Sequence, residues 1–230
     1  TDPTDQAWVN EGYSLKEKSY YPADFNGDGI SDFFVLFTYC KSLPGSPPSF
    51  IYHYCWAVYV NTGEPEYLTY INVQTFWNQS YPLFNLIDSD LDGNDELFLA
   101  IDQVNVFNAK CFEYDKNNKF NENTSKDILI NIPGQHAHDM LLVSADFEGD
   151  GAADHLLLKH SDLTFAGCAG FSNSCSNPNF GASNKYELLD FNGNGKTDIM
   201  FRNSSSSVIW EYDENLQTFY DIYSTTSINK

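Results

Sequence analysis

A chain of 230 residues with 42% hydrophobic residues can bury a sizeable core, either as one domain or as an array of repeats. Its formal net charge of −20 comes from 32 acidic and 12 basic side chains, and a surface of that sign repels nucleic acids and anionic lipids. Neither is therefore expected as a partner, and no apolar stretch approaches the roughly 18 residues of a membrane-spanning helix, so membrane insertion is not expected either.

Short aromatic and aliphatic runs, bounded by Gly, Pro, Asn, Asp and Ser, recur along the whole chain and predict strands. Aromatic residues make up 16% of the chain, which also favours an all-β fold. In chain order, we expect strands near residues 19–22, 33–39, 50–61, 66–75, 81–87, 97–101, 106–114, 128–132, 140–143, 155–159, 186–189, 199–202, 208–212 and 218–223. The third group of strands runs into Gly- and Ser-rich sequence at residues 167–183, so its outer strands are expected to be irregular or missing.

One acidic nine-residue segment follows the first strand of each group. Its copies are residues 24–32, 88–96, 146–154 and 190–198, called loops one to four below. Every copy has an oxygen-bearing side chain at positions 1, 3, 5 and 9 and Gly at position 6. Alternating carboxylates and carboxamides around a Gly-enabled turn provide the hard oxygen ligands that Ca²⁺ requires. Acidic surface turns are the alternative, but four copies in register favour calcium.

The same letters open an EF-hand, which needs a bidentate Glu at position 12 and a helix on each side. Position 12 is Val35, Leu99, Leu157 or Phe201, and each loop runs directly into an apolar stretch. The sequence therefore predicts a loop between two strands rather than between two helices.

The spacing of the loops predicts a repeat architecture. Loop starts are 64, 58 and 44 residues apart, and about four short strands per repeat is typical of propeller blades. We expect a single β-propeller domain over residues 1–230, with blades at about 18–76, 80–133, 138–184 and 185–230. Four blades can close a ring; the alternative is a segment of a larger or open propeller completed by a partner.

The loops and the strands after them resemble the FG-GAP/VCBS calcium repeats, a family that includes the propeller of integrin α-subunits, propeller lectins and repeats of secreted bacterial and fungal proteins. The resemblance implies up to four structural Ca²⁺ ions, each held by four side chains and the carbonyl of position 7. The implied ligands are Asp24, Asn26, Asp28, Ile30 and Asp32 in loop one; Asp88, Asp90, Asp92, Asn94 and Glu96 in loop two; Asp146, Glu148, Asp150, Ala152 and Asp154 in loop three; and Asp190, Asn192, Asn194, Lys196 and Asp198 in loop four.

The loops depart from the family pattern in charge and reach. Glu96 and Glu148 are one methylene longer than the usual residue. Loop four has only two carboxylates, and Lys196 adds a positive charge, so we expect it to bind calcium most weakly. The Phe-Gly and Gly-Ala-Pro signatures of the integrin-type repeat are absent, so nothing specific supports an integrin-like role.

The five cysteines give an odd count, so at least one cannot pair within the chain. Cys40 and Cys55 flank one turn and Cys168 and Cys175 bracket another, so each pair could close a local disulfide, which leaves Cys111 as a free thiol. Sequons at Asn78, Asn123 and Asn203 are candidate glycosylation sites. Together with weak calcium loops, which micromolar cytosolic Ca²⁺ rarely fills, these features predict a secreted protein.

The sequence contains few signals of other metal sites or of enzymatic activity. His136 and His138 could present two imidazoles to a metal, although a polar loop between blades is the simpler interpretation. No nucleophile elbow, zinc-protease motif or phosphate loop occurs, and with 32 acidic residues no carboxylate pair stands out as a glycosidase site.

Aromatic side chains could stack on sugar rings, or could equally pack the core. The candidates are Trp56, Trp77, Trp210, Tyr52, Tyr54, Tyr59, Tyr67 and Tyr70. Trp56 and Trp210 lie in the predicted third strands of their blades, which favours packing. The expected function is a calcium-stabilised binding module, not an enzyme, for glycans or an extracellular protein. The alternatives are a self-assembling structural subunit of an extracellular assembly and, less favoured, a propeller-scaffold hydrolase or lyase.

Overall fold

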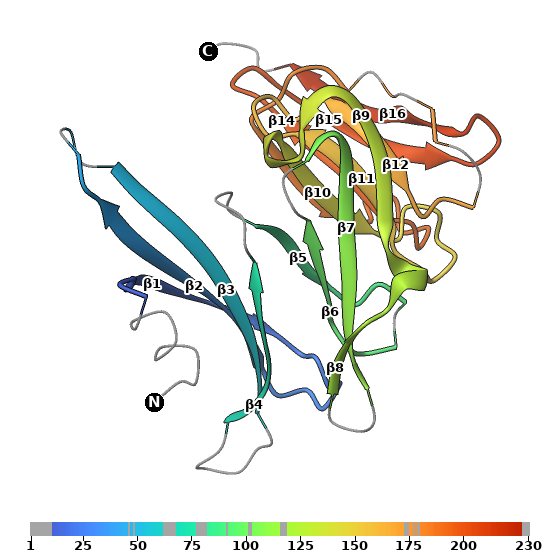
Figure 1. Ribbon diagram of the computed structural model, residues 1–230. Helices are drawn as coiled ribbons and strands as arrows, with labels where there is room; N and C mark the ends of the chain where they lie inside the picture. Colours follow the sequence, from blue (N-terminus) through green and yellow to red (C-terminus); the bar gives the residue numbers. More distant parts are fainter. Residues whose placement is uncertain are drawn as a thin grey trace. The chain divides into compact units, whose positions relative to one another are not determined.

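The computed structural model describes residues 11–45, 47, 49–61, 68–76, 82–90, 92–100, 103–115, 119–172, 175–176, 178 and 180–226. These residues form an all-β structure of four antiparallel sheets, with two 3-10 turns, η1 (Thr124–Lys126) and η2 (Ala137–Asp139) (Figure 1). In the described part of the chain no helix has the length and apolar character needed to span a bilayer.

Each sheet is a meander of strands in chain order. The first contains β1 (Ser14–Ala23), β2 (Asp32–Leu43), β3 (Ser49–Asn61) and β4 (Leu68–Phe76). The second contains β5 (Leu83–Ile87), β6 (Glu96–Ala100), β7 (Val104–Asp115) and β8 (Lys119–Glu122), and β9 (Ile128–His136) also pairs with β7. The third contains β10 (Met140–Ala145), β11 (Asp154–Lys159) and β12 (Phe165–Ala169). The fourth contains β13 (Lys185–Leu189), β14 (Asp198–Arg202), β15 (Ser206–Asp213) and β16 (Thr218–Thr226).

The second strand of each sheet is its most buried one. All five residues of β6 are buried, and the apolar residues of β11 and β14 are buried as well. A continuous apolar run is what a strand covered on both faces requires, since neither set of alternating side chains meets water. These strands therefore anchor the loops that precede them.

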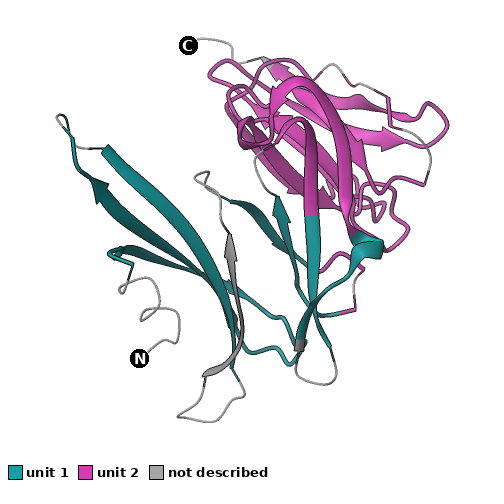
Figure 2. Ribbon diagram, viewed as in Figure 1, with its two compact units in different colours: residues 1–87, 93–102, 110–126 teal, residues 88–92, 103–109, 127–230 magenta. Residues whose placement is uncertain are grey.

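The chain divides into two compact units, which are described separately (Figure 2). The first unit covers residues 1–87, 93–102 and 110–126, and its main core gathers around Trp56, Phe34 and Phe112. The second covers residues 88–92, 103–109 and 127–230, with a core that includes Phe147 and Tyr212. Burying such aromatic side chains is the main stabilising contribution in each unit.

The predicted all-β class and the predicted position of every loop are confirmed, and the third sheet has only three strands among the described residues, as its sequence indicated. One strand prediction is wrong. The fourth strand of the second sheet was expected near residues 128–132, but β8 takes that place, in a polar stretch where no strand was expected. Residues 128–132 belong to β9, which pairs with the first half of the long strand β7.

Candidate metal centres

All four acidic loops join the first strand of a sheet to the second. Loop one follows β1 and ends at the first residue of β2, and loops two, three and four bear the same relation to β5 and β6, β10 and β11, and β13 and β14. Antiparallel pairing of these two strands brings the ends of each loop together. Position 9, as the first residue of a buried strand, is thereby placed opposite the start of its own loop.

The Asp at position 1 organises the backbone of its loop. In loop one, Asp24 accepts hydrogen bonds from the N–H of Asp28 at 3.2 Å and from the N–H of Gly29 at 2.8 Å. Asp146 accepts from Gly151 at 3.0 Å in loop three, and Asp190 from Gly195 at 3.0 Å in loop four. The Gly at position 6 has a positive φ in all four loops, between 78° and 93°, a conformation that side chains other than Gly rarely adopt.

Side-chain oxygens at positions 3 and 5 are held in the same way. The position 5 oxygen accepts the N–H of position 7 in three loops: Asp28 from Ile30 at 2.7 Å, Asp150 from Ala152 at 3.0 Å and Asn194 from Lys196 at 2.9 Å. Asn26 and Asn192 at position 3 accept the N–H of position 5 at 3.1 Å and 3.0 Å. A carboxylate or amide oxygen has more than one lone pair, so these bonds fix its direction and leave capacity for a metal.

The acidic residue at position 9 is buried in every loop. Asp32 and Asp198 are 0% exposed, and Glu96 and Asp154 are each 2% exposed. One oxygen of Asp32, Asp154 and Asp198 accepts the N–H of position 2, at 2.9, 3.0 and 2.8 Å. Four buried carboxylates at one repeat position are costly unless each is paired or binds a cation.

Two buried carboxylate oxygens have no hydrogen-bond partner among the described residues. They are Oδ1 of Asp198 at position 9 of loop four and Oε1 of Glu148 at position 3 of loop three. The other oxygen of Glu148 accepts the N–H of Ser172 at 2.6 Å, from outside the loop. A buried carboxylate oxygen without a hydrogen-bond donor is suited to bind a hard cation. The carboxylate and amide oxygens of the four loops are together the type of ligand that Ca²⁺ prefers.

Burial also disfavours the charged form of these carboxyl groups. It raises the pKa of Asp32 to about 6, against the backbone hydrogen bonds from Asn61 and Phe25 that lower it. Burial raises the pKa of Asp154 to about 7, and the nearby Glu148 adds to the effect. For Asp198, burial again comes first in raising the pKa, followed by the charges of Glu211 and Asp190. A bound divalent cation would reverse this penalty.

The negative charge of the buried carboxylate is compensated differently in loop two. Within the loop, Asp88, Asp90 and Glu96 place carboxylate oxygens within 4.8 Å of one another. Glu96 also pairs with a lysine: Nζ of Lys126 lies 3.1 Å from a carboxylate oxygen of Glu96 and 3.1 Å from one of Glu113, on β7. Part of the charge at position 9 is therefore already compensated by an ammonium group.

The sequence did not single out Glu211. This β15 side chain is 7% exposed and accepts hydrogen bonds from Nδ2 of Asn192, at position 3 of loop four, and from the hydroxyl of Tyr220 at 3.1 Å. The residues Glu-Tyr-Asp at 211–213 also occur at 113–115, and this repetition was the available sequence signal.

The two predicted disulfides differ in how the structure places their cysteines. Strands β2 and β3 pair Phe37 with Cys55 and Cys40 with Tyr52, so Cys40 and Cys55 lie three register positions apart and on opposite faces of the sheet. The structure does not bring these two together, which argues against that disulfide. Cys168 and Cys175 do lie together, with Sγ of Cys168 3.4 Å from the carbonyl oxygen of Cys175, and both are reduced. Cys111 is buried in β7.

Of the three sequons, Asn203 is exposed at the turn between β14 and β15. Asn123 is half-buried, and its Nδ2, the atom that would carry a glycan, donates to Glu113 at 3.0 Å. Asn78 lies outside the described residues. Asn203 is therefore the better placed of the two described sequons.

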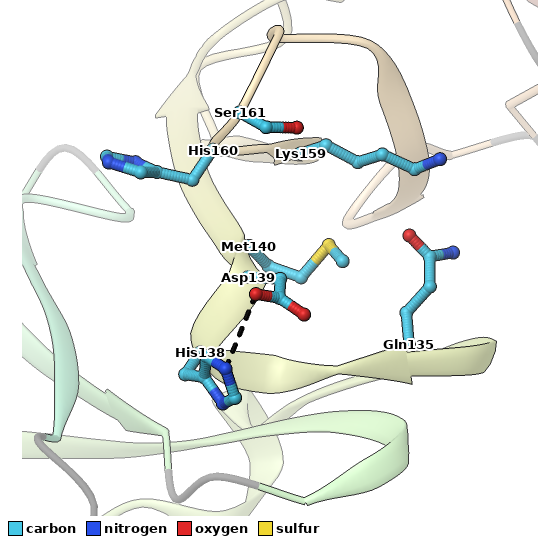
Figure 3. Close-up of a pocket in the computed structure, with 7 residues that line it drawn as sticks. All are labelled: Gln135, His138, Asp139, Met140, Lys159, His160 and Ser161. Atoms are coloured by element: carbon cyan, nitrogen blue, oxygen red, sulfur yellow. Dashed lines mark ion pairs between the residues drawn. The ribbon is translucent and has the colours of Figure 1, made fainter.

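One residue of the predicted histidine pair, His138, lines a recess of about 300 Å³ (Figure 3). The rings of His136 and His138 are 5.1 Å apart, and Nε2 of His138 is 3.3 Å from Asp139. Figure 3 shows the side chain of His160 directed to one side of the recess and that of Lys159 to the other. Among the described residues this cluster does not bring three metal-binding groups to one point, which favours the interpretation as a polar loop.

The aromatic candidates are mostly packing residues. Trp56 is fully buried and Trp210 packs against the core of the second unit, as their strand positions predicted. Tyr52, Tyr54 and Tyr59 are half-buried, while Trp77, Tyr67 and the side chain of Tyr70 lie outside the described residues. Where the structure describes side chains, the large aromatic ones that are exposed are Tyr20, Phe50, Phe191, Tyr220 and Tyr223.

Comparison with known proteins assigns no family. No family model and no curated protein matches the chain. Among solved structures, the holotoxin pore of the Photorhabdus luminescens Tc toxin matches with a TM-score of 0.32 and 13% identity. The match covers 94% of this chain but only 12% of the toxin chain. A similarity this low carries no argument about fold or function.

Proposed function

We propose that this protein is a calcium-stabilised β-propeller of four FG-GAP/VCBS-like blades that acts as an extracellular binding module. The observation that carries the proposal is the hydrogen-bond arrangement shared by loops one, three and four. In each of them position 1 accepts the N–H groups of positions 5 and 6, position 5 accepts the N–H of position 7, and position 9 is buried beside the loop. This arrangement directs side-chain oxygens toward the interior of a loop that the core keeps fixed.

In this proposal each calcium ion supplies the positive charge that the buried carboxylates lack. Asp198 and Glu148 contribute their unpartnered oxygens, and positions 1, 3 and 5 the remaining side chains. Because the ion binds residues on both sides of the loop, it ties the first strand of a blade to the second and couples folding to metal binding. Four ions would reduce the formal charge from −20 to about −12.

Contacts between successive loops support a repeat in which neighbouring blades associate in order. The N–H of position 8 donates to the start of the preceding loop three times: Asp95 to the carbonyl of Asp24 at 2.7 Å, Ala153 to that of Ser89 at 2.9 Å, and Thr197 to that of Asp146 at 2.7 Å. A contact that recurs at one loop position is expected when blades pack successively around an axis.

The calcium part of the proposal is tested by metal content and stability of the full chain. After chelation and dialysis against calcium, we expect up to four bound ions per chain, and a rise in the unfolding temperature that Mg²⁺ reproduces only weakly, because Mg²⁺ demands a tighter octahedral site. Unfolding curves that coincide with and without calcium would reject the proposal.

The binding part is tested with a glycan array screened with and without chelator. A hit that requires calcium would support a lectin-like module, in which calcium acts by holding the scaffold or the site. Glycan binding that persists in chelator would mean that the ligand site does not depend on calcium in the loops. If the array is silent while calcium still stabilises the chain, an extracellular protein becomes the favoured partner.

A structural subunit of an extracellular assembly is the second candidate, and Phe191 favours it. The Phe at position 2 is fully buried in loops one and three (Phe25 and Phe147), whereas in loop four Phe191 is 48% exposed and contacts Tyr223 at a ring distance of 5.4 Å. An exposed aromatic pair at a position that is otherwise buried is suited to contact with another chain. Measurement of mass against concentration in calcium distinguishes this candidate from a monomeric module.

A further inference from the structure

Strand β15 brings a carboxylate to loop four that the loop itself does not contain. Glu211 is 7% exposed, and its Oε2 accepts a hydrogen bond from Asn192, a predicted calcium ligand at position 3. Register places it beside Asp198, since Ile199 pairs with Trp210 and the next residues along the two strands are Asp198 and Glu211. The buried, unpartnered Oδ1 of Asp198 therefore belongs to the same group of oxygens.

The corresponding position in the other sheets shows what this pair of carboxylates requires. In the first sheet the same register position is Val60 of β3, and in the third it is Gly170, directly after β12; neither residue carries charge. In the second sheet the counterpart of Glu211 by sequence is Glu113 of β7, because the residues Glu-Tyr-Asp recur there and pair with the following strand as they do in β15. There Nζ of Lys126 lies 3.1 Å from Glu113 and 3.1 Å from Glu96 at position 9, so an ammonium group bridges the two acids.

In the fourth sheet no lysine or arginine of the described residues pairs with Asp198 or Glu211. The nearby Lys196 pairs instead with Glu214, at 2.7 Å. Glu211 also lines a polar recess of about 190 Å³ together with Lys196, Asp213, Glu214 and Tyr220. The pair therefore lacks the cation that its counterpart has, and the recess gives an ion and its water ligands a route to it.

We propose that Glu211 is a metal-coordinating residue, which joins Asp190, Asn192 and Asp198 as the third carboxylate of the loop-four calcium site. This inference rests on the proposed calcium binding, and it changes the order in which the four loops are expected to rank in calcium affinity. The nine residues of loop four contain two carboxylates, but the site as folded contains three, as loop one does. Loop four should then not be the weakest site by a wide margin, because affinity follows ligand charge.

The test is calcium titration of the full chain by calorimetry and equilibrium dialysis, with wild type compared to Glu211→Gln. Glutamine keeps the size of the side chain and an acceptor for Tyr220 but removes the charge. We expect one class of sites to weaken about tenfold or more, so that one ion per chain is lost at a free calcium concentration that saturates the wild type. The stability of the calcium-free protein should change little.

Two matched variants separate coordination from other roles. Glu214→Gln removes one negative charge from the same recess without removing a ligand, and should weaken binding much less and in a salt-dependent way. Tyr220→Phe removes the hydrogen bond to Glu211 and should leave the number of tight sites unchanged. Equal weakening by Glu211→Gln and Glu214→Gln, or an unchanged titration in Glu211→Gln, would overturn the assignment of Glu211. Absence of calcium binding in the wild type would instead reject the proposed function.

Discussion

Buried acids at position 9 make the calcium-free protein sensitive to pH. Asp32 and Asp154 have folded-state pKa values of about 6 and about 7, above the ordinary value of 3.8. A group whose pKa is raised on folding contributes stability that is fully present below the unfolded pKa, and that contribution is lost as the pH rises through the folded pKa. The calcium-free protein should therefore lose stability between about pH 4 and pH 7.

The expected loss is a few kcal/mol, because one pKa unit corresponds to about 1.4 kcal/mol. It can be measured by urea unfolding in chelator at pH 5 and pH 7.5. Asp154→Asn is the control, since asparagine keeps an acceptor for the N–H groups of Phe147 and Glu148 but does not titrate. Its dependence on pH should be shallower than that of the wild type; an equal slope would assign the effect to general charge repulsion. Saturating calcium should reduce or reverse the slope, since the metal favours the ionised form.

Cys168 and Cys175 are the cysteines expected to react with each other. The side-chain hydrogen bond with Cys175 lowers the pKa of Cys168, which favours the thiolate that attacks in disulfide exchange. After exposure of the folded protein to oxidised glutathione, non-reducing peptide mapping should find the peptides of Cys168 and Cys175 linked. Cys40, which is half-buried, should carry its own glutathione adduct, and the fully buried Cys55 should remain unmodified. A linked Cys40–Cys55 peptide would contradict the register of β2 and β3.

At the scale of the loop, Gly at position 4 has two functions that can be separated. Gly27 has a φ of 68°, and a Cβ there would lie 2.5 Å from Oδ1 of Asn94 and 3.2 Å from the carbonyl oxygen of Gly93, in loop two. Gly193 occupies the same position in loop four with a φ of 76°, and a Cβ there would have no described atom within 4 Å. Gly27 is needed because loops one and two approach each other closely at this point. Gly193 is needed only because its backbone has a positive φ.

We expect Gly193→Ala to cost about 1–2 kcal/mol of unfolding free energy, the penalty for a left-handed backbone. Gly27→Ala should cost at least about 1 kcal/mol more and lower calcium affinity in the first two loops, because the loops must move apart. Chemical denaturation in saturating calcium measures the difference. Equal losses in the two variants would mean that the contact between loops one and two contributes nothing.

Local features of the loops were predictable from the sequence, and features that depend on register were not. Asp24 and Gly29 are five residues apart, so their hydrogen bond follows from local turn chemistry. Glu211 reaches Asn192 only because β14 and β15 pair in one register, and no spacing in the sequence specifies that. Strand β8 was missed for a related reason. Its polar residues are typical of a turn, and pairing with Phe112 to Asp115 of β7 overrides their weak strand propensity.

At the scale of the whole molecule, the Phe at position 2 of loops one, three and four shows which sheets contact one another. In loop one Phe25 contacts Phe120 of β8 at a ring distance of 5.2 Å, and in loop three Phe147 contacts Phe219 of β16 at 5.3 Å. In both cases the Phe that follows the first strand of one sheet contacts the last strand, β8 or β16, of the next sheet along the chain. Phe191 is the corresponding residue of the fourth sheet, and the proposed closed ring requires that it pack against the first sheet.

Phe191→Ser therefore tests ring closure. In a closed ring, the calcium-loaded wild type should be monomeric at all concentrations, and the variant should lose about 1–3 kcal/mol of unfolding free energy, as expected for truncation of a partly buried Phe. Tyr20→Ser, at an aromatic side chain 61% exposed, is the control and should be nearly neutral. A wild type whose mass rises with concentration and returns to monomer in Phe191→Ser would instead indicate that a second copy covers this residue. If Phe191→Ser changes neither stability nor mass, the fourth blade has no neighbour at this position, and the chain is an open array.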